Sequence, residues 1–219
     1  MTTPNIRPGS RYGADDSFTD WFLRNKTILS WALLALAVAI GGLWFYQRSR
    51  AVRHENAEKA YFQARQSAAA GNLPLAVSDL KKVATRYEGT RPGIQAAMFL
   101  AQGLYDQKKH KEGIEELKRT LSKAPDDFVA PIHVLIANGY EELKDFGSAA
   151  TEYRAASAAT EFPAEKAQYL AAAARAYTAA GKPAEAKAIW TDLAADETGP
   201  MAAEARVRLG ELTAKPMIT

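Results

Sequence analysis

A pattern of small and bulky residues recurs four times along the 219-residue chain, at nearly constant intervals. In each copy a polar turn is followed by a small residue, and a bulky residue stands four positions later. Such a period indicates a repeat architecture, in which each unit buries its apolar face only against its neighbours. The small residues, spaced by 37, 36 and 37 positions, are Ala76, Gly113, Ala149 and Ala186, and their bulky partners are Leu80, Leu117, Tyr153 and Trp190.

A second set of small residues stands twelve positions before the first, within stretches of helical periodicity. Two antiparallel helices per repeat fit this pairing, because a small side chain on each helix lets the two backbones approach closely. Alanine is abundant while glycine and proline are scattered singly, which also favours an all-α fold. The second set comprises Ala64, Ala101, Ala137 and Ala174.

The pattern resembles that of tetratricopeptide repeats, in which a small residue, an aromatic three positions on and a second small residue after the turn recur. The best matches are "FLAQGLY" (99–105), "LIANGYEELKDFGSAATEY" (135–153) and "AAARAYTAAGKPAEAKAIW" (172–190). The first repeat departs from the pattern at Gln63 and Ser67. The resemblance implies an α-solenoid of about four helix pairs over residues 55–213, with 203–213 as a C-terminal capping helix and 214–219 as a flexible tail.

The resemblance also implies a partner-binding groove, because the first helix of each tetratricopeptide repeat lines the concave face. A mixture of aromatic, amide and charged side chains suits an extended peptide or a partner helix. A clamp for a free C-terminal carboxylate is not expected, since Met98, Val134 and Ala171 stand where lysine would be needed. The groove residues implied are Tyr61, Arg65, Met98, Gln102, Tyr105, Val134, Asn138, Glu141, Arg175 and Thr178.

Residues 28–46, "ILSWALLALAVAIGGLWFY", carry no charge and predict a transmembrane helix. Nineteen helical residues extend about 28 Å, close to the hydrocarbon thickness of a bilayer. Trp31 at one end and Trp44 at the other suit the headgroup regions. A buried soluble helix is the less favoured alternative. A cleaved export signal is disfavoured, because cleavage after the small residues at 35–39 would leave residues 40–46 as an apolar end.

The flanks of this stretch leave its orientation open. Three basic residues precede it within about twenty positions and four follow it, so the positive-inside rule leans slightly towards a cytoplasmic C-terminal side. One face of the helix carries only small side chains, which favours close contact with another membrane helix. An alanine-rich helix also produces such a face by chance. That face comprises Ala32, Ala35, Ala39 and Gly42.

The flanking segments complete the expected domain organisation. Residues 1–27 are expected to form a cytoplasmic tail that ends in a short amphipathic helix, because Phe18, Trp21 and Phe22 share one helical face. Residues 47–54 are expected to be a linker between the span and the repeats.

No motif in the chain predicts an enzyme. Cysteine is absent, which excludes thiol catalysis and thiolate metal sites, and the three histidines lack partners at ligand spacing. The net charge of +3 is dispersed, so no nucleic-acid footprint is evident, and no cofactor or small-molecule substrate is expected. The sequence "SDLK" (78–81) matches a serine–lysine nucleophile pattern, but its companion motifs are absent.

The order of segments resembles the YfgM family through "DWFLRNK" (20–26), the aromatic exit from the span at 44–46, and "GKPAEAKAIWTDL" (181–193). This resemblance implies a single-pass protein of the bacterial inner membrane with periplasmic repeats. It also implies an ancillary role at the SecYEG translocon together with a membrane-anchored periplasmic chaperone. Two alternatives stay open: an adaptor with cytoplasm-facing repeats, and a scaffold for cell-wall or outer-membrane assembly.

Overall fold

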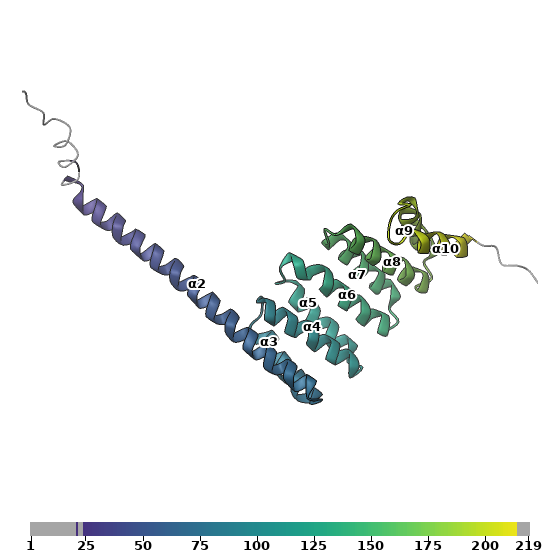
Figure 1. The fold of residues 1–219 in the computed structure, drawn as a ribbon, viewed down its shortest axis with the longest axis horizontal. Helices are drawn as coiled ribbons and strands as arrows, with labels where there is room; N and C mark the ends of the chain where they lie inside the picture. Colours follow the sequence, from purple (N-terminus) through teal and green to yellow (C-terminus); the bar gives the residue numbers. More distant parts are fainter. Residues whose placement is uncertain (1–20, 22–23, 214–219) are drawn as a thin grey trace, which may run out of the picture. The chain divides into compact units, whose positions relative to one another are not determined.

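The computed structural model describes Trp21 and residues 24–213, and within these residues the regular structure is helical throughout (Figure 1). This confirms the all-α prediction. The helices are α2 (Lys26–Ala69), α3 (Leu73–Arg86), α4 (Arg91–Asp106), α5 (His110–Leu121), α6 (Asp126–Glu142), α7 (Phe146–Ala159), α8 (Pro163–Ala179), α9 (Pro183–Ala195) and α10 (Ala202–Thr213).

Helix α2 is 44 residues long and contains both the apolar stretch and the first helix of the first repeat. Residues 47–54, predicted as a linker, are therefore helical. The reason is local: no glycine or proline occurs between Gln47 and Ala69, so nothing in the sequence interrupts the backbone hydrogen bonds. The chain divides into two compact units at Val52 and Arg53, inside that predicted linker.

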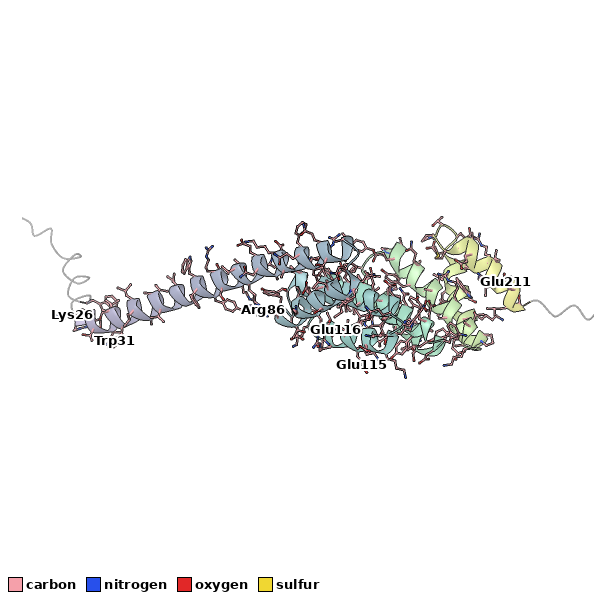
Figure 2. The ribbon with its side chains drawn as sticks, turned by 90° about the horizontal axis from the view of Figure 1, so that it is seen from below. Lys26, Trp31, Arg86, Glu115, Glu116 and Glu211 are labelled. Carbon is pink, nitrogen blue, oxygen red and sulfur yellow. The ribbon has the colours of Figure 1, made fainter. Side chains whose placement is uncertain are left out.

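The apolar part of α2 is long and apolar enough to span a membrane, and none of its most apolar window is buried. Trp31 near its start is 67% exposed (Figure 2). The amphipathic helix predicted around Phe18 and Phe22 lies outside the described residues, as does the predicted tail at 214–219.

Within Arg53–Thr219 the helices pair as the repeat pattern predicts. From α3 onwards each helix packs against the next, and α4 also contacts α6 (Figure 1). All four residues of the second small set are fully buried, and Ala76, Gly113, Ala149 and Ala186 are buried as well. Their bulky partners are buried too, so the predicted role of both sets in helix packing is confirmed.

Tyr105 shows how closely these helices approach. Its ring lies between Gly113 of α5 and Gly139 of α6, and a Cβ atom added to either glycine would clash with it. The Tyr105 hydroxyl donates a hydrogen bond to the Leu135 carbonyl oxygen at 3.1 Å. Burial, together with the nearby Tyr140, raises the pKa of the Tyr105 phenol. Tyr105 therefore joins α4 to the following repeat.

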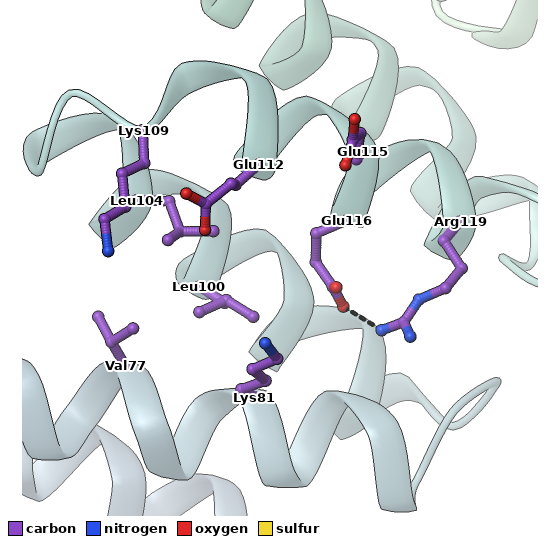
Figure 3. Close-up of a pocket in the computed structure, with 9 residues that line it drawn as sticks. All are labelled: Val77, Lys81, Leu100, Leu104, Lys109, Glu112, Glu115, Glu116 and Arg119. Carbon is purple, nitrogen blue, oxygen red and sulfur yellow. Dashed lines mark hydrogen bonds and ion pairs between the residues drawn. The ribbon is translucent and has the colours of Figure 1, made fainter.

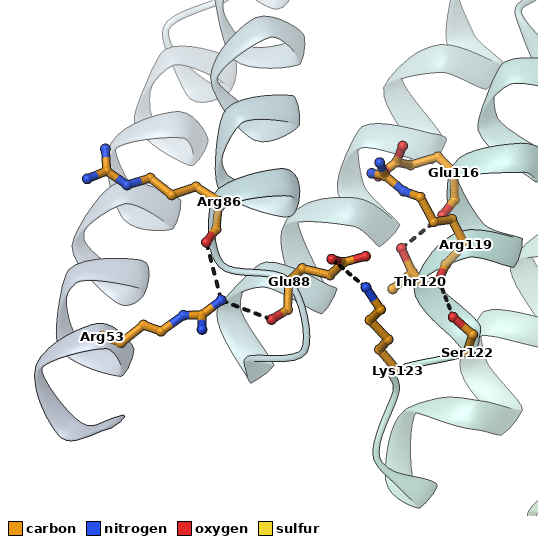
Figure 4. Close-up of polar contacts among 8 residues, drawn as sticks. All are labelled: Arg53, Arg86, Glu88, Glu116, Arg119, Thr120, Ser122 and Lys123. Atoms are coloured by element: carbon orange, nitrogen blue, oxygen red, sulfur yellow. Dashed lines mark hydrogen bonds and ion pairs between the residues drawn. The ribbon is translucent and has the colours of Figure 1, made fainter. Parts of the chain in front are cut away.

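Polar contacts link the loops of the first three repeats (Figure 4). Arg53 donates to the carbonyl oxygens of Arg86 and Glu88, both at 3.4 Å, and so holds the end of α3 against α2. The Glu88 carboxylate lies 2.7 Å from Lys123 Nζ in the loop after α5, and this contact lowers the pKa of Glu88. These contacts help to fix the register of the stacked repeats.

The four turns inside the repeats share one backbone geometry. Each contains one residue with positive φ, and these residues recur with the repeat period: Gly71 (79°), Lys108 (64°), Lys144 (60°) and Gly181 (71°). Their backbone N–H groups and those that follow them return to carbonyl oxygens in the last helical turn. Glycine adopts this left-handed conformation without steric cost, whereas lysine does not.

Replacing Lys144 with glycine should therefore raise the free energy of unfolding by about 1 kcal/mol, since it relieves left-handed strain at an exposed position. Chemical denaturation of the full chain measures this effect. Lys144→Ala is the matched control: it removes the same charge but keeps the Cβ atom, and it should bring no gain. Equal stabilisation by both substitutions would show that charge, and not backbone geometry, is responsible.

Candidate protein-binding groove

The predicted groove residues lie on α2, α4, α6 and α8, the first helices of the four repeats. Four of them have exposed side chains and the other six are half-buried. The exposed residues are Arg65, Gln102, Arg175 and Thr178, and the half-buried residues are Tyr61, Met98, Tyr105, Val134, Asn138 and Glu141. Exposed side chains thus occur on α2, α4 and α8, while the predicted residues of α6 are half-buried.

A cavity of about 350 Å³ lies between the later part of α2 and α4. Tyr61 and Arg65 line it, and the Arg65 guanidinium stands 5.8 Å from the centre of the Tyr61 ring, within range of a cation–π interaction. Phe62 beside them is 61% exposed. We call this the α2–α4 cavity; its remaining lining residues are His54, Glu58, Arg91, Pro92 and Gln95.

The middle of the groove is occupied by contacts within the repeats. The Tyr153 hydroxyl of α7 lies 2.7 Å from Asn138 Oδ1 and 3.2 Å from Glu141 Oε2. Burial and the adjacent Glu141 carboxylate raise the pKa of Tyr153. The phenol therefore stays protonated, and its O–H group donates the hydrogen bond. Asn138 and Glu141 therefore hold α7 against α6, and Tyr105 is similarly engaged with α6.

A second cavity, of about 500 Å³, lies between α8, α9 and α10. Arg175 and Thr178, both predicted, line it together with Trp190 and Arg208. Its volume falls within the ~300–1,000 Å³ typical of ligand pockets. We call it the α8–α10 cavity; its other lining residues are Ala179, Glu211 and Leu212.

Alternating charges form the rim of the α8–α10 cavity. Arg175 Nη1 lies 2.7 Å from Glu204 Oε1, and Arg208 Nη1 lies 2.9 Å from Glu211 Oε2. Arg208 Nε is 3.7 Å from the same Glu204 oxygen, which is within ion-pair range but too long for a hydrogen bond. Arg175, a predicted groove residue, therefore has its guanidinium already engaged by Glu204.

Two buried donor atoms beside this cavity make no hydrogen bond among the described residues: Trp190 Nε1 and Arg208 Nε, the latter being within ion-pair range of Glu204. Trp190 is fully buried. A buried indole N–H without an acceptor typically costs about 1–3 kcal/mol, so the Trp190 N–H lowers the stability of the fold at this point.

The predicted groove did not extend beyond α8, so it did not include Arg208 and Leu212, which line this cavity. The repeat period contained the signal. Met98, Val134 and Ala171 occupy equivalent positions, and one further period of 37 residues reaches Arg208. The same step from Arg175 reaches Leu212. Arg208 and Leu212 of the capping helix α10 therefore stand at the positions that the predicted groove residues occupy in the first helix of a repeat.

A further cavity, of about 460 Å³, lies between α3, α4 and α5 (Figure 3). Its rim carries both signs of charge, including the Glu116–Arg119 ion pair, and Leu100 and Leu104 form its floor. None of the predicted groove residues lines it.

Each of the three histidines contacts a side chain of its own or a neighbouring helix. His133 Nδ1 lies 2.7 Å from Glu152 Oε2, between α6 and α7, and His110 is buried with its ring 5.6 Å from that of Tyr105. His54 pairs with Glu58 along α2. Among the residues that the structure describes, no group of three metal-ligating side chains comes together.

Stacked antiparallel helix pairs with small residues at each close approach define a helical-repeat protein. The chain belongs to the tetratricopeptide repeat-like domain family, whose model matches residues 19–214. Proteins of such repeats are generally non-catalytic scaffolds for protein–protein interaction. A comparison with curated proteins finds no match.

Solved structures share the fold at low sequence identity. A protein from Podosopora anserina with nearly identical TPR-like repeats matches with a TM-score of 0.55 at 16% identity, covering 71% of this chain and 84% of that one. A tetratricopeptide repeat protein from Parabacteroides merdae matches with a TM-score of 0.55 at 17% identity, covering 72% of this chain and 60% of that one. BtubC from P. vanneervenii matches with a TM-score of 0.52 at 16% identity, covering 74% of this chain and 68% of that one. These similarities support the solenoid architecture.

Proposed function

We propose that the chain is a membrane-anchored scaffold whose repeats recruit protein partners on the periplasmic side of the bacterial inner membrane. The observation that carries the proposal is the order of its parts: one apolar helix runs without a break into four tetratricopeptide helix pairs. In this proposal residues 1–27 are cytoplasmic, 28–46 span the membrane, 55–213 form the interaction domain and 214–219 are a tail.

The proposed partners are the SecYEG translocon and a membrane-anchored periplasmic chaperone, so that the chain is an ancillary translocon subunit. The resemblance of "DWFLRNK" and "GKPAEAKAIWTDL" to the YfgM family supports this choice. Within the membrane, the small face of α2 is the proposed contact for another membrane helix. Small side chains along this face would let the backbone of another helix approach closely.

Fusing reporters to Thr219 tests the orientation. We expect alkaline phosphatase to be active there and a fluorescent protein that folds only in the cytoplasm to stay dark. The reverse pattern would refute the periplasmic scaffold. It would favour the second candidate, an inner-membrane adaptor with cytoplasm-facing repeats, which is supported by the small excess of basic residues after the span. Those residues are Arg48, Arg50, Arg53 and Lys59, against Arg11, Arg24 and Lys26 before it.

A further inference from the structure

A cavity of about 380 Å³ lies between α7 and α8, and none of the predicted groove residues lines it. Its volume falls within the ~300–1,000 Å³ typical of ligand pockets. The α7 side of the lining follows one helical face at intervals of three or four residues, formed by Thr151, Arg154, Ala155 and Ala158. The alanine side chains end at Cβ and so leave space beside α8. We call this the α7–α8 cavity.

The charged residues that line this cavity are both basic. Arg154 of α7 and Lys166 of α8 are exposed, and in the described part of the chain neither side chain forms an ion pair or a hydrogen bond. Glu165, the acidic neighbour of Lys166 in sequence, is not part of the lining and accepts a hydrogen bond from Thr160 Oγ1 at 2.7 Å. Two unpaired cations around one cavity attract a negatively charged group.

The two aliphatic hydroxyl groups of the lining already donate within α7. Ser157 Oγ donates to the Arg154 carbonyl oxygen at 2.8 Å, and Thr151 Oγ1 donates to the Gly147 carbonyl oxygen at 3.1 Å. The Arg154 guanidinium and the Lys166 ammonium are therefore the charged donors that remain for a ligand. Arginine presents a planar fork that matches a carboxylate, and lysine adds a compact point charge.

The apolar part of the lining favours a carboxylate that is carried by a side chain. Ala155, Ala158 and Leu170 provide this surface, which suits the methylene groups of an acidic side chain. A protein segment also agrees with the family, whose members are generally scaffolds for protein–protein interaction.

We infer that the α7–α8 cavity binds an acidic segment of a protein partner, whose side-chain carboxylates pair with Arg154 and Lys166. This inference rests on the proposed scaffold function for the presence of a partner, and it adds a second contact outside the predicted groove.

Nuclear magnetic resonance of the full chain in detergent micelles tests this inference directly. The probe is an acetylated and amidated hexapeptide of alternating alanine and glutamate, which has no terminal carboxylate. We expect saturable shifts of backbone amide signals that are largest in α7 and α8. A peptide of alternating alanine and glutamine, which has nearly the same shape without the charge, should bind at least threefold more weakly. Added salt should weaken binding of the glutamate peptide, because exposed ion pairs are screened.

A matched pair of double variants tests the two basic residues. Arg154→Gln with Lys166→Gln removes both cations from the cavity, and the affinity for the glutamate peptide should fall about three- to tenfold, since exposed ion pairs are individually weak. Lys111→Gln with Arg206→Gln removes the same charge from exposed positions of α5 and α10 outside the lining, and it should leave the affinity unchanged. Thermal unfolding of both variants shows whether the repeats remain folded.

Three results would overturn the inference: largest shifts outside α7 and α8, equal affinity for the two peptides, or equal loss of affinity in the two double variants. Displacement of the peptide by inorganic phosphate but not by acetate, at equal ionic strength, would also overturn it and would assign the cavity to a phosphate-bearing ligand. Failure here would leave the scaffold function standing if partners still cross-link to the groove at Gln102, so the two proposals fail separately.

Discussion

Replacing Gly139 with alanine should lower the free energy of unfolding by about 2–4 kcal/mol. The added Cβ atom would clash with the Tyr105 ring and with Ile114, and both belong to the packed core of the second and third repeats. Overpacking of a dense core typically costs about 1–3 kcal/mol, and here the Tyr105 ring is also held by its hydrogen bond to Leu135. Denaturant titration of the purified chain measures the loss.

Gly210→Ala provides the matched control for this prediction. Gly210 lies in α10 and a Cβ atom there would meet nothing within 4 Å, so alanine should stabilise the helix by about 0.5–1 kcal/mol. Opposite signs at the two positions would confirm that the close approach at Tyr105 decides the outcome. A loss at Gly139 no larger than 0.5 kcal/mol would contradict the packing described here.

Truncating Trp190 to alanine should cost about 3–5 kcal/mol, because its fully buried side chain is the largest in the core. Trp190 belongs to a core cluster that extends from α6 to α10, and its own helix α9 packs against α8 and α10. Repeat proteins couple mainly to their nearest neighbours. The loss of amide hydrogen-exchange protection should therefore be concentrated in α8–α10, while α3–α5 keep most of theirs.

Trp44→Ala is the control, since the Trp44 side chain in α2 is 66% exposed. It should leave hydrogen exchange in α8–α10 unchanged. Uniform loss of protection from α3 to α10 after Trp190→Ala would instead mean that the repeats unfold as one cooperative unit.

Much of the fold was predictable because repeat packing depends on small residues at fixed intervals. Ala64, Ala101, Ala137 and Ala174 mark the close approaches, and all are fully buried. Residues 47–54 were predicted as a linker between the span and the repeats, without a prediction that they are helical. That segment lacks glycine and proline, so its backbone continues the helix on either side.

The candidate groove was less predictable than the fold. The family pattern gives the face on which a residue lies but not its partners. Tyr105, Asn138 and Glu141 lie at groove positions, yet each hydrogen-bonds within the domain, and these contacts depend on side chains from other helices. The α8–α10 cavity needs residues of the capping helix, which the motif does not cover.

Photo-cross-linking from the groove tests the central claim most directly. A photoreactive amino acid is placed at Gln102, an exposed groove position of α4, and separately at Lys111, an exposed position of α5, in cells that express the full chain. The account predicts adducts with a translocon subunit or its periplasmic chaperone from position 102 and not from position 111. Adducts only from position 111, or none from position 102, would contradict it.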